Sequence, residues 1–341
     1  MDEEKIVQRA RRAVAEKVFP GCVIGLIQLN KQIVMSVGTL DGNVPTQENT
    51  IYDVASITKS IPTASLALMF IAQGKLSLED PVNKYLSELR NDYGATIEDL
   101  LRYRVKGPRM SQLKFKTFEE IRTHIFEHGF DESPSEKHAF TNLPAFLLGI
   151  IIERVDGEIL PALAHRYFFE PLKMNDTTFF LASPDQDASP HNFSYRRNCV
   201  GDTHLIAPTE IVDGEEIRGI VHDESARLFA RARRAVGHAG LFSTAPDLLN
   251  FLEAFLKKGF RKPLLEGAQK GLGWQIDEPW MGERRSEQTF GKTGFTGTSI
   301  VVDIERGIGL VILANRTYPK RPPDTAAINA FRQDVADIVF G

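Results

Sequence analysis

Apolar and polar positions alternate most clearly at the two ends of the chain. Residues 3–18 repeat apolar side chains at helical spacing, and Pro20-Gly21 ends that pattern. Two β-rich runs follow, Cys22–Gln28 and Gln32–Val37, and the Asn30-Lys31 pair between them is typical of a hairpin. The N-terminal end therefore predicts one amphipathic helix followed by two paired strands.

Strand character returns near the C-terminal end. Ser299–Asp303 and Ile308–Ala314 flank Glu305-Arg306-Gly307, which predicts a second hairpin. Asp324 then opens a final helix with an apolar face. That face consists of Ala327, Ile328, Phe331, Val335 and Ile338.

The long middle of the chain, about residues 75–265, has mostly helical patterning. Just before it, residues 61–73 are apolar on nearly all sides and end at Gly74, as a buried helix does. Pro144–Val155 places its proline in a first helical turn, and Asp247–Phe255 has the pattern of another helix.

Strands at both ends and helices between them predict an α+β fold. We expect one antiparallel sheet built from both termini and flanked by helices, with a mostly helical domain inserted. Residues 1–75 and 266–341 would form the α/β sheet domain, and residues 76–265 the helical one. The active site is expected at the interface between the two domains.

Composition narrows the range of partners. The 341 residues are 42% hydrophobic and 25% charged, which is ordinary for a globular protein, and a net charge of −4 gives no electrostatic case for binding nucleic acid or an anionic membrane. Cys22 and Cys199 are the only cysteines, and we expect free thiols rather than one bridge. The N-terminus lacks a secretory pattern, so we expect a cytoplasmic protein that acts on a small molecule. Its oligomeric state stays open.

Ser56 and Lys59 stand three residues apart where the buried helix begins. Residues i and i+3 share a helix face, so hydroxyl and amine would lie side by side. A serine hydroxyl needs an adjacent base to become a nucleophile, and lysine serves only if its pKa is lowered. Chance supplies about one such pair in a chain of this size, and Ser111 with Lys114 is another, but the position before a buried helix favours Ser56. Pro62 should kink that helix.

Lys292-Thr293-Gly294 precedes the second hairpin. A lysine and a threonine hydroxyl at a strand edge suit the binding of a substrate carboxylate, and glycine permits close approach of the backbone. The same residues are typical of an ordinary surface turn, which this pattern taken alone favours.

Other chemical patterns are weaker. His124, Glu127 and His128 match an H-x-x-E-H zinc pattern, but no segment offers a third ligand and the same stretch suits an amphipathic helix. His222 and His238 are expected to be structural hydrogen-bonding residues, since the chain has no G-x-S-x-G elbow. Nucleotide-binding glycine motifs are absent too, so we expect no cofactor and no metal. A run of arginines is expected on a solvated face or loop: Arg227, Arg231, Arg233 and Arg234.

The ordered combination of these motifs resembles the serine β-lactamase and penicillin-binding-protein superfamily, nearest the branch of class C β-lactamases, D,D-carboxypeptidases and esterases. The resemblance covers nearly the whole chain and implies a sheet domain from both termini plus a helical domain. Besides the two motifs, the matching stretches are Pro20 to Val23, Tyr52 to Ser56, Asn142 to Gly157, Val221 to Glu224, Gly237 to Thr244, Gly271 to Trp274 and Gly294 to Gly297.

The resemblance implies a catalytic group and a substrate-binding group. Ser56 would be the nucleophile and Lys59 its partner, and Asn142 would hold Lys59 or a substrate amide. Lys292 and Thr293 would bind the carboxylate or polar end of the substrate. The backbone N–H groups of Ser56 and Phe295 would form the oxyanion hole, with Gly294 beside them.

The chain departs from the family pattern at two places. The third motif of this branch is normally Tyr-x-Asn, but here it reads Phe140-Thr141-Asn142, and a phenyl ring neither donates nor accepts a proton. Phe140 would then only contribute to substrate binding. The loop Arg102 to Gly107 replaces a turn that usually resembles His-Thr-Ser-Gly.

Three accounts of the missing phenol stay open. Lys59 acts alone as the base, or another group such as Tyr103 reaches the site, or the protein acylates slowly or not at all. Loss of a general acid–base group typically costs about 10²–10⁴-fold in rate. We expect a serine hydrolase that forms an acyl-enzyme with small esters, D-amino-acid amides or peptides, or β-lactams. The alternative is a catalytically inactive binding or scaffold protein on the same fold.

Overall fold

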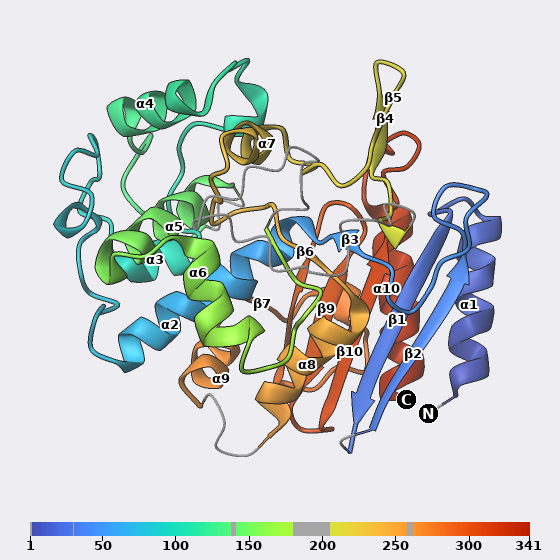
Figure 1. Ribbon diagram of the computed structural model, residues 1–341. Helices are drawn as coiled ribbons and strands as arrows, with labels where there is room; N and C mark the ends of the chain where they lie inside the picture. Colours follow the sequence, from blue (N-terminus) through green and yellow to red (C-terminus); the bar gives the residue numbers. More distant parts are fainter. Residues whose placement is uncertain (1, 30, 138–140, 180–204, 258–261) are drawn as a thin grey trace.

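The computed structural model describes residues 2–29, 31–137, 141–179, 205–257 and 262–341. Its centre is a six-stranded antiparallel sheet in the order β2-β1-β10-β9-β8-β7 (Figure 1). The strands are β1 (Gly21–Gln28), β2 (Lys31–Gly38), β7 (Gln275–Ile276), β8 (Thr289–Thr293), β9 (Ser299–Asp303) and β10 (Ile308–Ala314). Both predicted hairpins are present, and β1 pairs with β10, so the antiparallel sheet built from both termini is confirmed.

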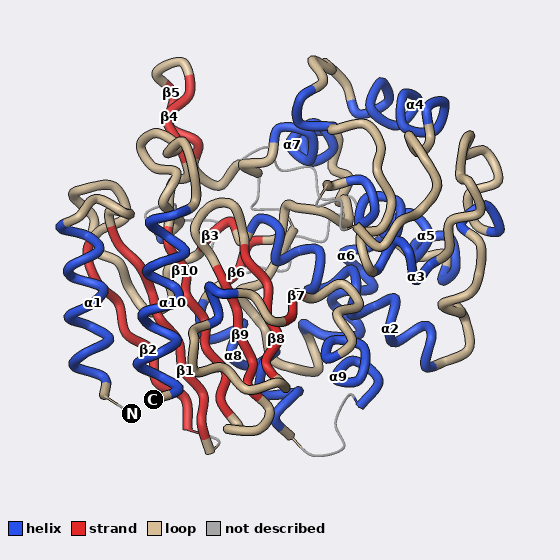
Figure 2. The backbone as a smooth tube through the Cα atoms, turned by 180° about the vertical axis from the view of Figure 1, so that it is seen from behind, coloured by secondary structure: helices blue, strands red, loops and turns tan. Residues whose placement is uncertain are grey.

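Three helices cover the two faces of this sheet. Helices α1 (Glu3–Ala15) and α10 (Ala326–Phe340) lie side by side on one face, as Figure 2 shows from behind. Helix α8 (Ala245–Leu256) packs on the other face against β1 and β10. Helix α8 belongs to residues 76–265, the range predicted to form the helical domain. Part of that range therefore packs on the sheet. The predicted domain boundaries at residues 75 and 265 stay a prediction.

Strand β1 shows why the sheet needs cover on both faces. Its side chains alternate between the faces, as in any strand. Cys22, Ile24 and Leu26 join the core beneath α1 and α10, whereas Val23 and Ile27 join the larger core on the side of α8. All five are buried, so the strand is apolar along its length. Cys22 is a free, buried thiol, as expected, and Cys199 lies outside the described residues.

The middle of the chain is mostly helical, as predicted, and lies beside the sheet (Figure 1). Besides α8, the helices from α2 onward in this part of the molecule are α2 (Ser65–Ala72), α3 (Ile97–Leu101), α4 (Phe118–His128), α5 (Leu143–Asp156), α6 (Leu160–Ala164), α7 (Glu224–Arg231) and α9 (Lys262–Gln269). Short strands that the pattern did not indicate are β3 (Tyr52–Asp53) paired with β6 (Phe242–Ser243), and β4 (Glu210–Val212) paired with β5 (Glu215–Ile217).

The buried helix after Ser56 is interrupted near its start. A 3₁₀ turn over Ala55–Lys59 leads into an irregular turn over Ser60–Ala64, and α2 follows. Ile61 has non-helical angles (φ −115°, ψ 111°), which is the kink expected from Pro62. The stretch Ala55–Ala72 is long and apolar enough to cross a membrane, but 78% of it is buried inside the structure, as in a core helix.

Candidate active site

Ser56 and Lys59 lie together, as their spacing predicts. Lys59 Nζ donates a hydrogen bond of 2.7 Å to Ser56 Oγ and another of 2.9 Å to the backbone oxygen of His238. The lysine is 5% exposed, while Ser56 is partly exposed. Burial lowers the pKa of Lys59 to about 8, against the opposing charge of Asp223. A neutral amine is therefore available next to the hydroxyl at mildly alkaline pH.

The backbone just before Ser56 is held in an unusual conformation. Ala55 has a φ of 48°, a left-handed conformation that costs a residue with a Cβ atom about 1–2 kcal/mol. The buried carboxylate of Asp53 accepts hydrogen bonds from the N–H groups of Ala55 (2.8 Å) and His222 (2.7 Å). These bonds fix the turn that presents Ser56, which is a common way to support strain at functional sites.

The turn between β8 and β9 is tied directly to this segment. Thr296 Oγ1 donates to the backbone oxygen of Asp53 (2.7 Å), and Thr298 Oγ1 donates to that of Val54 (3.1 Å). Only glycine fits at position 294 without a shift of its neighbours, because a Cβ atom there would stand 2.1 Å from Thr298 Oγ1 and 2.4 Å from the backbone oxygen of Val54. The structure thus brings the predicted Gly294 next to the segment that carries Ser56.

Lys292 is buried in the same region, on β8. Burial, together with the nearby charge of Lys59, lowers the pKa of Lys292 to about 7, and Glu278 opposes this. Its Nζ atom lies over the ring of Tyr103, 4.7 Å from the centroid. Tyr103 is itself buried, with a left-handed φ of 55°, and burial raises the pKa of its hydroxyl. The atypical loop Arg102 to Gly107 therefore reaches the site, where the ring face of Tyr103 contacts the amine of Lys292.

Asn142 belongs to a polar network beneath the lysine. Its amide donates to Asp223 Oδ2 (3.0 Å), while Asp223 Oδ1 accepts from the Ser225 hydroxyl (2.6 Å) and lies 3.4 Å from His238 Nε2. Burial alone would raise the pKa of Asp223, but His238, the Ala226 N–H and Ser225 hold it well below its usual range. Burial lowers the pKa of His238, although Asp223 opposes this. Asp223 is a site residue that the sequence analysis missed, although it stands in a family-like stretch.

The remaining predicted binding residues are placed less directly. Thr293 is partly exposed and donates through both its N–H (3.1 Å) and its hydroxyl (3.2 Å) to Gln275 Oε1, so its side chain is already bonded within the protein. Phe295 is 44% exposed, and its ring lies between the ring of His222 and the guanidinium of Arg316. Phe140 lies outside the described residues.

The weaker sequence patterns have structural roles. His124 and His128 stack on one face of α4, and the described residues contain no group of three side chains that could hold a metal ion. His222 is buried against Glu210 (3.0 Å), as expected for a structural histidine. The expectation of a solvated arginine run is wrong at Arg227, whose guanidinium donates to the backbone oxygens of Val221 and His222.

Two buried, low-pKa lysines around one partly exposed hydroxyl form an arrangement suited to acyl transfer. The sequence model of the family described as Beta-lactamase matches residues 6–334. The chain belongs to the beta-lactamase family. The proteins of this family and the similar structures described below are hydrolases of the serine β-lactamase and penicillin-binding-protein type. The predicted family, fold and enzyme class are therefore confirmed.

Relatives within the beta-lactamase family differ in the activity they are named for. A putative D-alanyl-D-alanine carboxypeptidase of Escherichia coli O157:H7 is 28% identical over 317 residues, which span 79% of this chain and 70% of that protein. EstCE1, a hydrolase with promiscuous acyltransferase activity, has a similar fold, with a TM-score of 0.73 at 20% identity over 99% of this chain and 98% of its own. So has a beta-lactamase/D-alanine carboxypeptidase from Pseudomonas syringae, with a TM-score of 0.72 at 19% identity over 97% and 98%.

Replacing Gly294 by alanine should disable the site without unfolding the protein. The added methyl group must displace either Thr298 or the Val54 backbone, and a shift of about 1 Å at a reacting group costs roughly 10²-fold in rate. The measurement is the rate at which a fluorophosphonate labels Ser56. Gly307→Ala, in the next turn, is the control: it strains a backbone with a φ of +64° but meets no atom within 4 Å, so it should label at the wild-type rate. Equal rates in both variants would contradict the placement of this turn beside Ser56.

Replacing Asp223 by asparagine should move the pH dependence of that labelling. The negative charge of Asp223 favours the ammonium form of Lys59, so its removal lowers the pKa of Lys59 below about 8. The rise of rate with pH, which follows deprotonation of the lysine, should shift toward lower pH. Rate constants measured from neutral to alkaline pH test this, and a shift toward higher pH would refute it.

Proposed function

We propose that the protein hydrolyses small carbonyl substrates through an acyl-enzyme on Ser56. The observation that carries this is the 2.7 Å contact between Ser56 Oγ and the buried amine of Lys59, whose pKa is about 8. The neutral amine takes the hydroxyl proton while the oxygen attacks the substrate carbonyl. Lys59 passes that proton to the leaving group as the bond to the carbonyl carbon breaks, and water then hydrolyses the ester bond to Ser56 and releases the acid.

Lys59 acts as the base without help from a phenol. Tyr103 contacts the site through its ring face, which lies against Lys292 Nζ. Burial also keeps its hydroxyl protonated at neutral pH, because it raises the pKa. The Tyr103 ring instead helps to exclude water from Lys292, which supports the low pKa of that amine.

Lys292 selects a substrate that bears a carboxylate. Its pKa of about 7 leaves the amine partly charged at neutral pH, and an incoming carboxylate would favour the ammonium form. Relatives named as D-alanyl-D-alanine carboxypeptidases point the same way. Peptides that end in a D-amino acid are therefore the first substrate class, ahead of β-lactams and simple esters.

A binding or scaffold protein without turnover is the second candidate, and Phe140 is the observation in its favour. The family tyrosine takes part in proton transfer, and phenylalanine cannot replace it. The two candidates differ in one measurable property, which is whether Ser56 forms a covalent bond with an acylating probe.

Intact-protein mass spectrometry after incubation with a fluorophosphonate, and separately with a penicillin, tests the proposal. We expect one adduct per chain with the fluorophosphonate, absent in Ser56→Ala. Release of D-alanine from a peptide ending in D-alanyl-D-alanine, lost in the same variant, would then establish the substrate class. A folded wild-type protein that gives no adduct with either probe would favour the binding-protein alternative.

A pair of tyrosine exchanges separates the accounts of the missing phenol. Phe140→Tyr restores the family group and should raise turnover by about 10²-fold or more. Tyr103→Phe keeps the ring and should leave turnover within about threefold, because the Tyr103 hydroxyl takes part in no proton transfer in the proposed mechanism. Steady-state kcat with the same substrate measures both. A loss of about 10²-fold in Tyr103→Phe would show instead that its phenol replaces the family tyrosine.

A further inference from the structure

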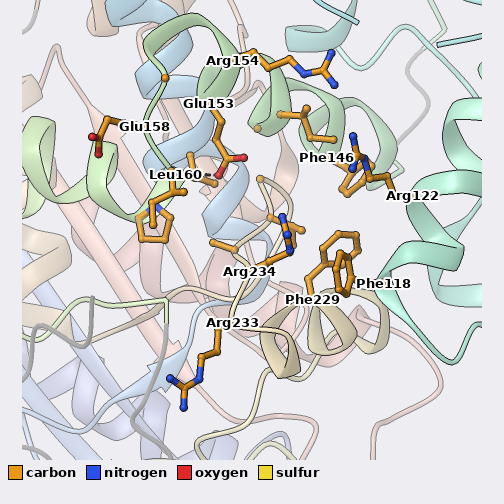
Figure 3. Close-up of a pocket in the computed structure, with 18 residues that line it drawn as sticks. Phe118, Arg122, Phe146, Glu153, Arg154, Glu158, Leu160, Phe229, Arg233 and Arg234 are labelled. Atoms are coloured by element: carbon orange, nitrogen blue, oxygen red, sulfur yellow. Dashed lines mark hydrogen bonds between the residues drawn. The ribbon is translucent and has the colours of Figure 1, made fainter. Parts of the chain in front are cut away.

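A second concave site lies in the helical part of the molecule, among α4, α5, α6 and α7. It is an open cavity of about 360 Å³, and Figure 3 shows its walls. Ser56, Lys59 and Lys292 are not among the residues that line it. Its size lies within the range of small-molecule sites in proteins.

One half of this cavity is aromatic. Phe229 on α7 packs against both Phe118 on α4 and Phe146 on α5, with ring centroids 5.4 and 5.5 Å apart. Phe146 and Phe229 are buried, and Phe118 is half-buried. The rings meet at interplanar angles of 51° and 63°, so they form an apolar wall with an angled surface, which suits the apolar body of a small organic molecule.

The other half is cationic. Figure 3 shows Arg122 and Arg234 beside the three rings, whereas Arg154 and Arg233 point away. Arg234 lies over Phe118, 4.9 Å from the centroid, and Arg122 lies over Phe126 at 5.5 Å. Neither Arg122 nor Arg234 has a carboxylate within ion-pairing distance among the described residues, whereas Arg154 is paired with Glu88. These two exposed guanidinium groups thus each contact a ring and keep donors for an anion.

One acidic side chain also faces the cavity. Glu153 accepts a hydrogen bond of 2.8 Å from the N–H of Leu160, and burial raises the pKa of Glu153 while Arg234 opposes this. Glu158, the other acid of the lining, points outward in Figure 3. The inward charges are therefore two guanidinium groups against one carboxylate that is already bonded to the backbone.

We propose that this cavity binds a small organic carboxylate with an apolar body, and that its occupancy changes the reactivity of Ser56. The rings would hold the body, and Arg122 and Arg234 the carboxylate. Binding itself does not depend on chemistry at Ser56. The effect on reactivity rests on the proposed function.

The route from this cavity to Lys59 is one residue long. Gly237 lines the cavity, and the backbone oxygen of the next residue, His238, accepts the hydrogen bond from Lys59 Nζ. Gly149 on α5, which also lines the cavity, packs closely against this stretch, because a Cβ atom there would stand 2.9 Å from the Gly237 nitrogen. Thr63 also bonds to Gly237 (2.8 Å). A ligand that moves the 236–238 stretch must therefore move the acceptor of the catalytic lysine.

Isothermal titration calorimetry on the full chain tests the binding, with cinnamate as the probe and neutral cinnamamide as its match. We expect saturable binding of cinnamate to the wild type and equally to Ser56→Ala and Lys292→Met, which separates this cavity from the site around Ser56. Arg122→Gln with Arg234→Gln should weaken binding by about tenfold or more. Arg233→Gln, the same change in a side chain that points away, should stay within about twofold.

Ile150→Phe is a second variant, which narrows the cavity and leaves the guanidinium groups intact, and it should weaken cinnamate binding as well. Equal affinity for cinnamamide, loss of binding in Lys292→Met, or full binding in the double arginine variant would each overturn the proposed site. Circular dichroism melting of every variant confirms that it is folded.

The rate of fluorophosphonate labelling of Ser56, with and without saturating cinnamate, tests the coupling. We expect a change of at least about twofold in the wild type and none in the double arginine variant. An unchanged wild-type rate would overturn the coupling. If the ligand-free wild type does not label at all, the proposed function fails, while the calorimetry still decides whether the cavity binds the carboxylate.

Discussion

The burial of one amine governs the rest of this structure. In water, the amine of Lys59 would stay protonated until well above pH 8 and could not act as a base. Its removal from solvent brings the pKa to about 8. A buried amine needs hydrogen-bond partners, and Ser56 Oγ and the His238 oxygen supply them. One of these partners, Ser56 Oγ, is the proposed nucleophile, so the same burial that destabilises the ammonium form places a base beside it.

That burial requires several segments that are distant in sequence to meet. The strained turn at Ala55 is held by Asp53, and the β8–β9 turn is bonded to the same stretch by Thr296 and Thr298. Lys292 places a second low-pKa amine nearby, and the charge of Lys59 disfavours the ammonium form of Lys292. Gly237 lines the cavity and is the neighbour of His238, so the proposed binding cavity lies one residue from the acceptor of Lys59.

The sequence predicted those parts of the site that depend on local geometry. Ser56 and Lys59 meet because residues three apart share a helix face, and the sheet follows from alternating strands at both ends. Tyr103 and Asp223 could not be placed in this way. Tyr103 reaches Lys292 through a loop of irregular backbone, and Asp223 meets Asn142 across 81 positions of sequence. Such contacts depend on long-range packing, which no local pattern encodes.

The strand order has a consequence for how the protein is made. Strand β1 pairs with β10, and β8 carries Lys292, so the sheet and the surroundings of Ser56 need strands near the end of the chain. At about 5–20 residues per second, a ribosome completes β1 many seconds before β10 exists. The emerging chain cannot desolvate Lys59 in that interval, because the walls around it are still missing. The proposed reactivity of Ser56 is thus withheld during translation and is acquired only when the two ends of the polypeptide join.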